Sequence, residues 1–369
     1  MAAHAPRPGT AADAPVPAAA PKRYLALDAY RGFIMIFLAS NGFGFGALRN
    51  DPFWGRVAGW FDHVPWEGCV FWDLIQPAFM FMVGVAMPFA LANRAARGAT
   101  FGGNARHVAV RALRLVVLSQ ILISVSSGKL GFQLINVLAQ IAFTYLLCFW
   151  IMQLRWSRQA VTAGLILAGH WALFAIFPGP EGPFSRTGNV GQTIDLAVLG
   201  STYGGYYVTI NFLSSTVTTL FGVWTGQLLM SERTHGQKLR ILLAAMALAF
   251  AAGLALTPVN PMVKRIWTAS FTLYSTGWVL LMLIAFYWVI EVKNRRSWAF
   301  PLLVVGMNSI FIYSLGQVLR GWLNRAVGVF TFNWEFIGTL APVAQSLTVT
   351  LAMWYCCWWL YRRKIFFKL

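Results

Sequence analysis

Long apolar runs alternate with short polar segments along most of the chain. A helix needs about 20 mostly apolar residues to cross the roughly 30 Å hydrocarbon core of a bilayer. We therefore predict an all-α, polytopic integral membrane protein with about ten transmembrane helices. The predicted helices lie near residues 32–48, 71–92, 112–127, 133–153, 160–177, 207–230, 241–257, 267–290, 300–319 and 342–361.

The basic residues predict the orientation of these helices. Most of the 29 Lys and Arg residues fall in the loops and ends on one side of the predicted bundle. Because short cytoplasmic loops carry an excess of Lys and Arg, we expect that side, and both termini, to face the cytoplasm. The segments 49–70, 178–206 and 320–341 are then expected on the outer side. The first two are rich in turn-forming and aromatic residues, which is typical of functional loops.

The composition excludes a soluble protein. Apolar residues make up 58% of the chain and charged residues only 11%, against about 25% charged in soluble domains. The net charge of +18 does not indicate nucleic-acid binding, because the basic residues form short clusters between apolar runs. The four cysteines have no metal-ligand or disulfide spacing, so we interpret them as small apolar residues. The expected environment is a lipid bilayer.

Two regions of different character divide the chain. Residues 1–21 are rich in Ala and Pro and lack the basic start and apolar core of a signal peptide. We predict that they form a disordered cytoplasmic tail, and that residues 22–369 form one transmembrane domain. Compact loops and the absence of a signal peptide favour a bacterial inner membrane.

Three of the eleven acidic residues lie close together with a histidine. Asp62, His63 and Glu67 fall in the first outer segment, and Asp73 lies about one turn inside the second predicted helix. An ionisable group at that depth is functional or paired, although an Asp at a helix start can also be a simple partner of the helix dipole. His63 titrates near neutral pH and is a candidate general base, or otherwise a solvated loop residue.

Other polar residues near the first and third predicted helices have two interpretations each. Asn41 could donate to an oxyanion or make an interhelical hydrogen bond. Asp28 and Arg31 are three residues apart and could form an interfacial ion pair or part of a site. Arg111 and Arg114 could hold phosphate groups, but the positive-inside bias explains them equally well.

Further polar residues inside the predicted helices indicate a polar cavity or path. Each one alone would suit a hydrogen bond between helices. The chain lacks the Walker A loop, the dinucleotide-binding glycine fingerprint, HExxH and GxSxG, so a nucleotide-containing cofactor would bind without them. These intramembrane residues are Asn136, Gln140, Asn211, Gln227, Asn308 and Gln317.

Five motifs, in order, carry a family resemblance. RYLALDAYRG opens the series at 23–32, and His63–x2–Trp66–x–Gly68–x4–Asp73 continues into an aromatic run ending at Gly84. With these motifs the chain resembles the heparan-α-glucosaminide N-acetyltransferase family of transmembrane acetyltransferases. The other three motifs are PVNPMVKRIWTASFTL at 258–273, GMNSIFIY at 306–313 and YRRKIFFKL at 361–369.

The resemblance implies transfer of an acetyl group across a membrane. Acetyl-CoA would be supplied from the cytosol, and the acceptor, an amino sugar or a glycan, would wait on the outer side. His63 matches the family's active-site histidine and Asn41 matches its asparagine. We expect Asp73 or Asp62 to orient the imidazole. The family also suggests a homodimer.

We assign five residues to the acetyl-CoA site. Arg111 and Arg114 would contact its phosphates, while Trp267, Ser270 and Asn308 come from the matching motifs. No metal site is predicted.

One stretch departs from the family pattern. Within the fourth predicted helix, Ala139 and Gln140 replace the Gln–Arg pair that the family usually shows before an apolar–Tyr run, and the spacer between Asn41 and His63 is longer. The departure means a different acceptor or a loss of activity. A sugar transporter that uses the same polar path, and an inactive envelope scaffold, therefore remain as alternatives.

Overall fold

The structure is a computed structural model, and it describes residues 24–367. The predicted tail 1–21 lies outside these residues. Within them the chain is helical and forms no β-strand, only isolated bridges. The α-helices are α1 (Leu25–Ser40), α2 (Gly55–Trp60), α3 (Ile75–Ala95), α4 (Phe101–Ser127), α5 (Val137–Ile151), α6 (Trp156–Ile176), α7 (Val190–Leu199), α8 (Asn211–Met230), α9 (His235–Leu256), α10 (Ala269–Tyr287), α11 (Phe300–Gly306), α12 (Ser309–Thr331) and α13 (Ala341–Arg362).

The long helices follow the predicted apolar runs in order, and the differences lie at their ends. The run 300–319 is interrupted at Met307 and Asn308, which separate α11 from α12. Helix α12 continues to Thr331, so Arg320 lies in a helix and not in the outer loop predicted for 320–341. The other two predicted outer segments contain the short helices α2 and α7.

Judged by length and composition alone, seven stretches of the described residues are long and apolar enough to cross a membrane. One of them, Ser309–Arg362, contains both α12 and α13. Helix α5 has only 15 residues, and α8 is an interior helix that carries a buried run of Ser and Thr. The structure therefore supports a polytopic helical membrane protein, while the count of ten remains a prediction.

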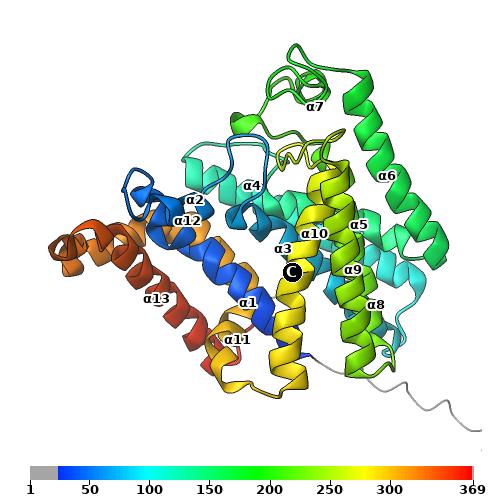
Figure 1. Ribbon diagram of the computed structural model, residues 1–369. Helices are drawn as coiled ribbons and strands as arrows, with labels where there is room; N and C mark the ends of the chain where they lie inside the picture. The colour runs from blue at the N-terminus through cyan, green and yellow to red at the C-terminus, as the bar shows by residue number, and fades with distance from the viewer. Residues whose placement is uncertain (1–23, 368–369) are drawn as a thin grey trace, which may run out of the picture.

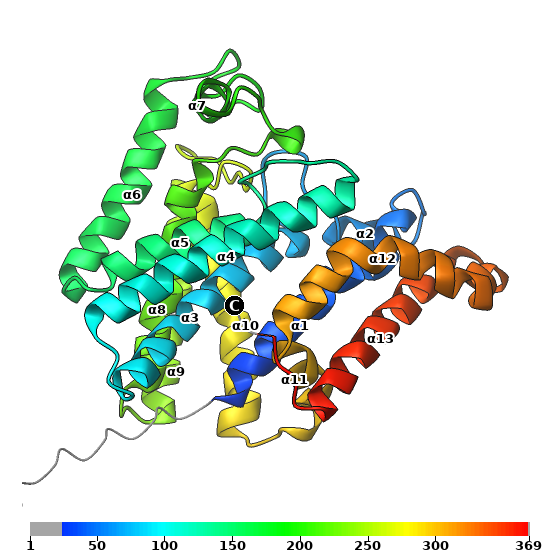
Figure 2. The same ribbon diagram turned by 180° about the vertical axis from the view of Figure 1, so that it is seen from behind.

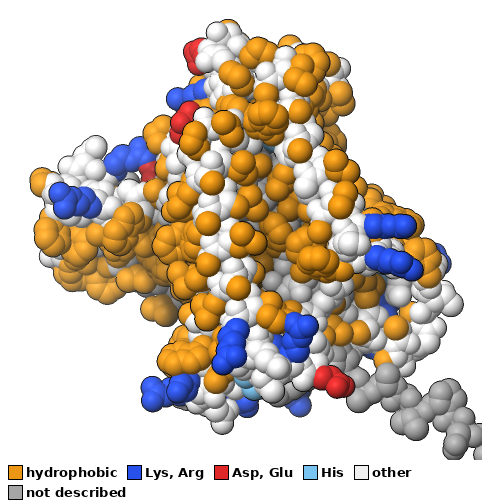
Figure 3. Space-filling model, turned by 45° about the vertical axis from the view of Figure 1, so that its right-hand side comes forward, with side chains coloured by type: hydrophobic (Ala, Val, Ile, Leu, Met, Phe, Trp, Pro, Cys, Tyr) orange, Lys and Arg blue, Asp and Glu red, His pale blue; other side chains and the backbone are white. Residues whose placement is uncertain are grey.

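The outer surface suits a lipid environment. Figure 3 shows hydrophobic side chains over the middle of one face, with Lys and Arg mainly toward its margins. Helices α4, α6 and α9 expose large apolar residues, including Leu113, Leu165 and Leu248. In Figures 1 and 2, α2 and α7 lie toward one end of the helices, and α11 and the end of α13 toward the other.

At two crossings, helices pack with their backbones in close contact. A Cβ added at Gly84 of α3 would lie 1.9 Å from the carbonyl oxygen of Thr219 in α8. A Cβ added at Gly306 of α11 would lie 1.9 Å from the carbonyl oxygen of Asp28 in α1. Glycine is therefore needed at both crossings, as in other membrane helix pairs with small residues at the contact. These crossings fix α1 and α3, which supply much of the site.

Candidate functional site

His63 and Asp73 form the centre of the site. His63 lies in the loop after α2, and Asp73 lies in the 3-10 helix Phe71–Leu74 that leads into α3. The Nδ1 atom of His63 is 2.6 Å from Oδ1 of Asp73, whose side chain is only 1% exposed. The backbone N–H of Val70 donates to Oδ2 of the same carboxylate at 3.3 Å. The pair predicted from the sequence is thus formed by two adjacent chain segments.

Lys264 is the third charged group at this centre. Its Nζ atom lies 3.5 Å from Oδ1 of Asp73 and 3.3 Å from Nδ1 of His63. The loop between α9 and α10 brings it there, because Glu67 and Val263 form an isolated β-bridge across the two loops. The neighbouring Arg265 donates to the carbonyl oxygens of Val64 and Pro65. Lys264 was not among the predicted site residues, although it lies in the motif 258–273.

The charges around His63 favour its neutral form. Burial lowers the pKa of His63, the hydrogen bond to Asp73 raises it, and the positive charge of Lys264 lowers it again, with a net decrease. Asp73 and Lys264 compensate each other, so a protonated imidazole would add an uncompensated charge. Because a carboxylate only accepts, Nδ1 carries the proton toward Asp73 and Nε2 keeps its lone pair. His63 is therefore arranged as a general base or nucleophile.

Cys69, the nearest thiol in the sequence, is not set up as a nucleophile. Burial, with a further contribution from the negative charge of Asp73, raises its pKa to about 12. The thiol therefore stays protonated near neutral pH, which leaves it a poor nucleophile.

Asp62 has a different partner from Asp73. Its carboxylate forms an ion pair with Arg49 and accepts the backbone N–H of His63 at 2.8 Å. It thus shapes the loop beside the imidazole, while Asp73 is the acid that contacts the ring.

Asn41 and His63 line one cavity of about 380 Å³, which we call the outer cavity. Asn41 ends α1 in the left-handed conformation, with a φ of 50°, which Asn adopts more readily than most residues. Gln76 of α3 also lines this cavity and donates to the side chain of Gln140, which in turn donates to Asn211. Gln140 is therefore a fully buried link in a chain of neutral amides.

A second cavity of about 550 Å³, which we call the inner cavity, lies further along the same helices. Its charged lining residues are Asp28, Arg31 and Arg111. The guanidinium of Arg111 lies over the ring of Tyr145 at 4.8 Å, and its Nε atom is buried without a hydrogen-bond partner. Such an unpaired donor suits an anionic ligand. Arg114 is exposed and does not line this cavity.

The other residues predicted to contact the cofactor line neither cavity. Trp267 is fully buried, and its indole N–H donates to Oγ1 of Thr218 at 3.2 Å. Ser270 is equally buried beside Thr268. The side-chain amide of Asn308 donates to the carbonyl oxygen of Ile365 and accepts the backbone N–H of Phe367.

Asn308 thereby holds the last described residues against the helices. Two of these residues, Phe366 and Phe367, line the inner cavity.

The fold and the site indicate an integral membrane protein in which the partly exposed His63 lies against the buried Asp73 and Lys264. Comparison with curated proteins shows a distant relationship to heparan-alpha-glucosaminide N-acetyltransferase. The human (Homo sapiens) protein of that name is 22% identical over an alignment that covers 95% of this chain, and the mouse (Mus musculus) protein is 20% identical over 94% of the chain. The chain spans 60% of the length of both relatives. No protein-family model matches the chain.

Proposed function

We propose that the chain is a transmembrane acetyltransferase with ten membrane-spanning helices and both termini in the cytoplasm. It moves an acetyl group from cytosolic acetyl-CoA to an amino sugar or glycan on the outer side, most simply the periplasmic side of a bacterial inner membrane. The observation that carries this proposal is the His63–Asp73 pair. Its imidazole lines the outer cavity, and the helices that form this cavity also form the inner cavity with its arginines. The distant acetyltransferase relatives support it.

Acetyl-CoA would lie across the two cavities in one orientation. Arg31 and Arg111 line the inner cavity, where the phosphate groups of acetyl-CoA would be held. The thioester arm would extend along α3 toward His63. The acceptor amine or hydroxyl would enter the outer cavity from the other face.

The proposed chemistry follows from the tautomer of His63, in which Nδ1 carries the proton and Nε2 is free to accept one. Nε2 takes a proton from the acceptor, whose nitrogen or oxygen attacks the thioester carbonyl. The new C–N or C–O bond forms, the C–S bond breaks, and the CoA thiolate leaves and is protonated. Asn41, which lines the same cavity, can donate to the oxyanion of the tetrahedral intermediate.

A second route gives the same products in two steps. His63 itself attacks the thioester, and the acceptor then attacks the acetyl-imidazole. Incubation with labelled acetyl-CoA and no acceptor separates the routes, because only the second route leaves an acetyl group on His63.

The test of the function is release of free thiol from acetyl-CoA by purified protein, with and without glucosamine. We expect glucosamine-dependent release that falls by about 10²-fold or more in His63→Ala. His107→Ala is the matched control, since His107 lines neither cavity. Binding of acetyl-CoA without any thiol release, with a panel of amino sugars, would contradict the proposal and favour a transporter. Failure to bind acetyl-CoA at all would favour a scaffold.

A further inference from the structure

One face of α3, together with the 3-10 helix before it, lines both cavities. Trp72 and Gln76 line the outer cavity, and Val83 and Ala86 line the inner cavity. Their spacing of three or four residues puts them on one side of the helix. Phe79 lies between them in this series and lines both cavities.

The neighbouring helices have the same division. On α1, Arg31 lines the inner cavity and Leu38 the outer cavity. On α12, Ile310 lines the inner cavity and Tyr313 the outer cavity. The two cavities therefore lie one above the other along shared helices, with Phe79 common to both.

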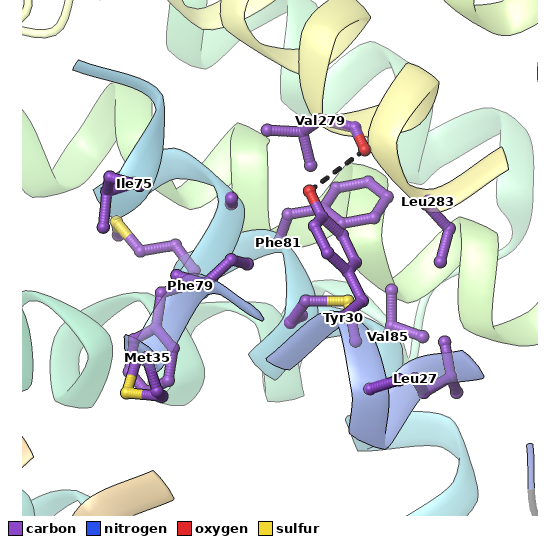
Figure 4. Packing of buried hydrophobic residues seen from close by; sticks show 14 of the residues in the cluster. Leu27, Tyr30, Met35, Ile75, Phe79, Phe81, Val85, Val279 and Leu283 are labelled. Carbon is purple, nitrogen blue, oxygen red and sulfur yellow. Dashed lines mark hydrogen bonds between the residues drawn. The ribbon is translucent and has the colours of Figure 1, made fainter. Parts of the chain in front are cut away.

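Phe79 is packed at this level and is not free in a wide channel. It is 6% exposed and belongs to the main hydrophobic core. Met35 lies on α1 between the inner and outer lining residues, belongs to the same buried cluster as Phe79 (Figure 4) and is fully buried. A packed apolar layer of this kind excludes water and ions, because it offers their polar groups no hydrogen-bond partners.

We infer that Phe79 is the partition of a continuous passage through the protein and the residue that must move aside for the acyl arm. This inference rests on the proposed function for the identity of what passes, a slender thioester arm. In the resting state the aromatic ring closes the passage. Rotation about its side-chain bonds, against the flexible side chain of Met35, would join the two cavities.

Thiol labelling tests the partition without any enzymatic reaction. The four native cysteines are replaced by Ala, and Ala86→Cys introduces one thiol in the inner cavity. The full chain is reconstituted in vesicles and sorted by orientation, and a membrane-impermeant maleimide is added to the face on which His63 lies. We expect slow labelling with Phe79 present and labelling several-fold faster in Phe79→Ala.

Ile75→Ala is the matched control, because Ile75 also lies on α3 but lines the outer cavity alone. It should leave the labelling rate unchanged. Labelling from the opposite face monitors folding and should proceed at the same rate in every variant, and Phe79→Leu provides a milder change if the Ala variant is lost. Equal labelling rates with and without Phe79 would overturn the inference. Since no acetyl-CoA is present, this outcome is independent of whether the thiol-release assay succeeds.

Discussion

At the scale of single residues, the site depends on the contacts among a carboxylate, an ammonium group and a neutral imidazole. Asp73 is buried against both His63 and Lys264, and the short contact is with the imidazole. The carboxylate fixes the ring and its tautomer, while the ammonium compensates the carboxylate and disfavours a proton on the ring. This division of roles gives each residue a separate signature in kinetics.

Lys264→Gln should shift the pH profile. Lys264 lowers the pKa of His63, so its removal raises that pKa, and a larger share of the imidazole is protonated at a given acidic pH. Because the base must be neutral, the acidic limb of kcat/KM should move to higher pH, with little change in the alkaline plateau. The measurement compares variant and parent protein with one acceptor, so ionisation of the acceptor cancels. Arg49→Gln is the control, and an unchanged acidic limb in Lys264→Gln would contradict the assigned role.

Asp73→Asn should remove most of the activity. The amide keeps the size of the side chain but loses the charge and can favour the wrong imidazole tautomer, so we expect a fall of about 10²–10⁴-fold in kcat. Asp62→Asn should cost less than about 10-fold, since Asp62 pairs with the exposed Arg49 and such pairs contribute little. Equal losses in the two variants would mean that Asp62 matters as much as Asp73.

Sequence reasoning could find His63 and Asp73 because they lie ten residues apart across one loop. It could not find Lys264, which is 201 residues from His63 and reaches it only through the bridge between two loops. It also assigned Trp267 and Ser270 to the cofactor, but their polar side chains are buried among neighbouring hydroxyl groups. A motif marks residues that the fold needs as well as residues that touch a ligand.

At the scale of elements, the helices were predictable because long apolar runs have few other solutions in a bilayer. Their ends were less so. Helix α12 continues to Thr331, since Arg320 is satisfied inside the protein by the carbonyl oxygen of Ala39 and the hydroxyl of Ser346. A charge count alone treats such an arginine as a loop residue.

Gly84→Ala should destabilise the protein. The added methyl group would collide with the backbone of Thr219 and push α3 away from α8, at a cost of about 1–3 kcal/mol. Gly164→Ala in α6 is the control, because a Cβ there meets nothing within 4 Å and Ala favours a helix. Thermal unfolding in detergent measures both. A melting temperature for Gly84→Ala equal to that of the control would show that the crossing is looser than described.

At the scale of the whole molecule, the proposed transfer of the acetyl group has a direction across the membrane. The inner cavity carries the arginines, the outer cavity carries His63, and the distribution of basic residues predicts which face is cytoplasmic. Activity in detergent cannot test this arrangement, because both faces are then open to the same solution.

The most direct measurement is transfer across a sealed membrane. The protein is reconstituted with its His63 face toward the vesicle interior, and the vesicles are filled with glucosamine. Acetyl-CoA that carries a label in its acetyl group is then added outside. We expect labelled N-acetylglucosamine to accumulate inside the vesicles and free CoA to stay outside, and we expect neither product with His63→Ala. Product that forms only when donor and acceptor share one side would contradict transfer through the protein.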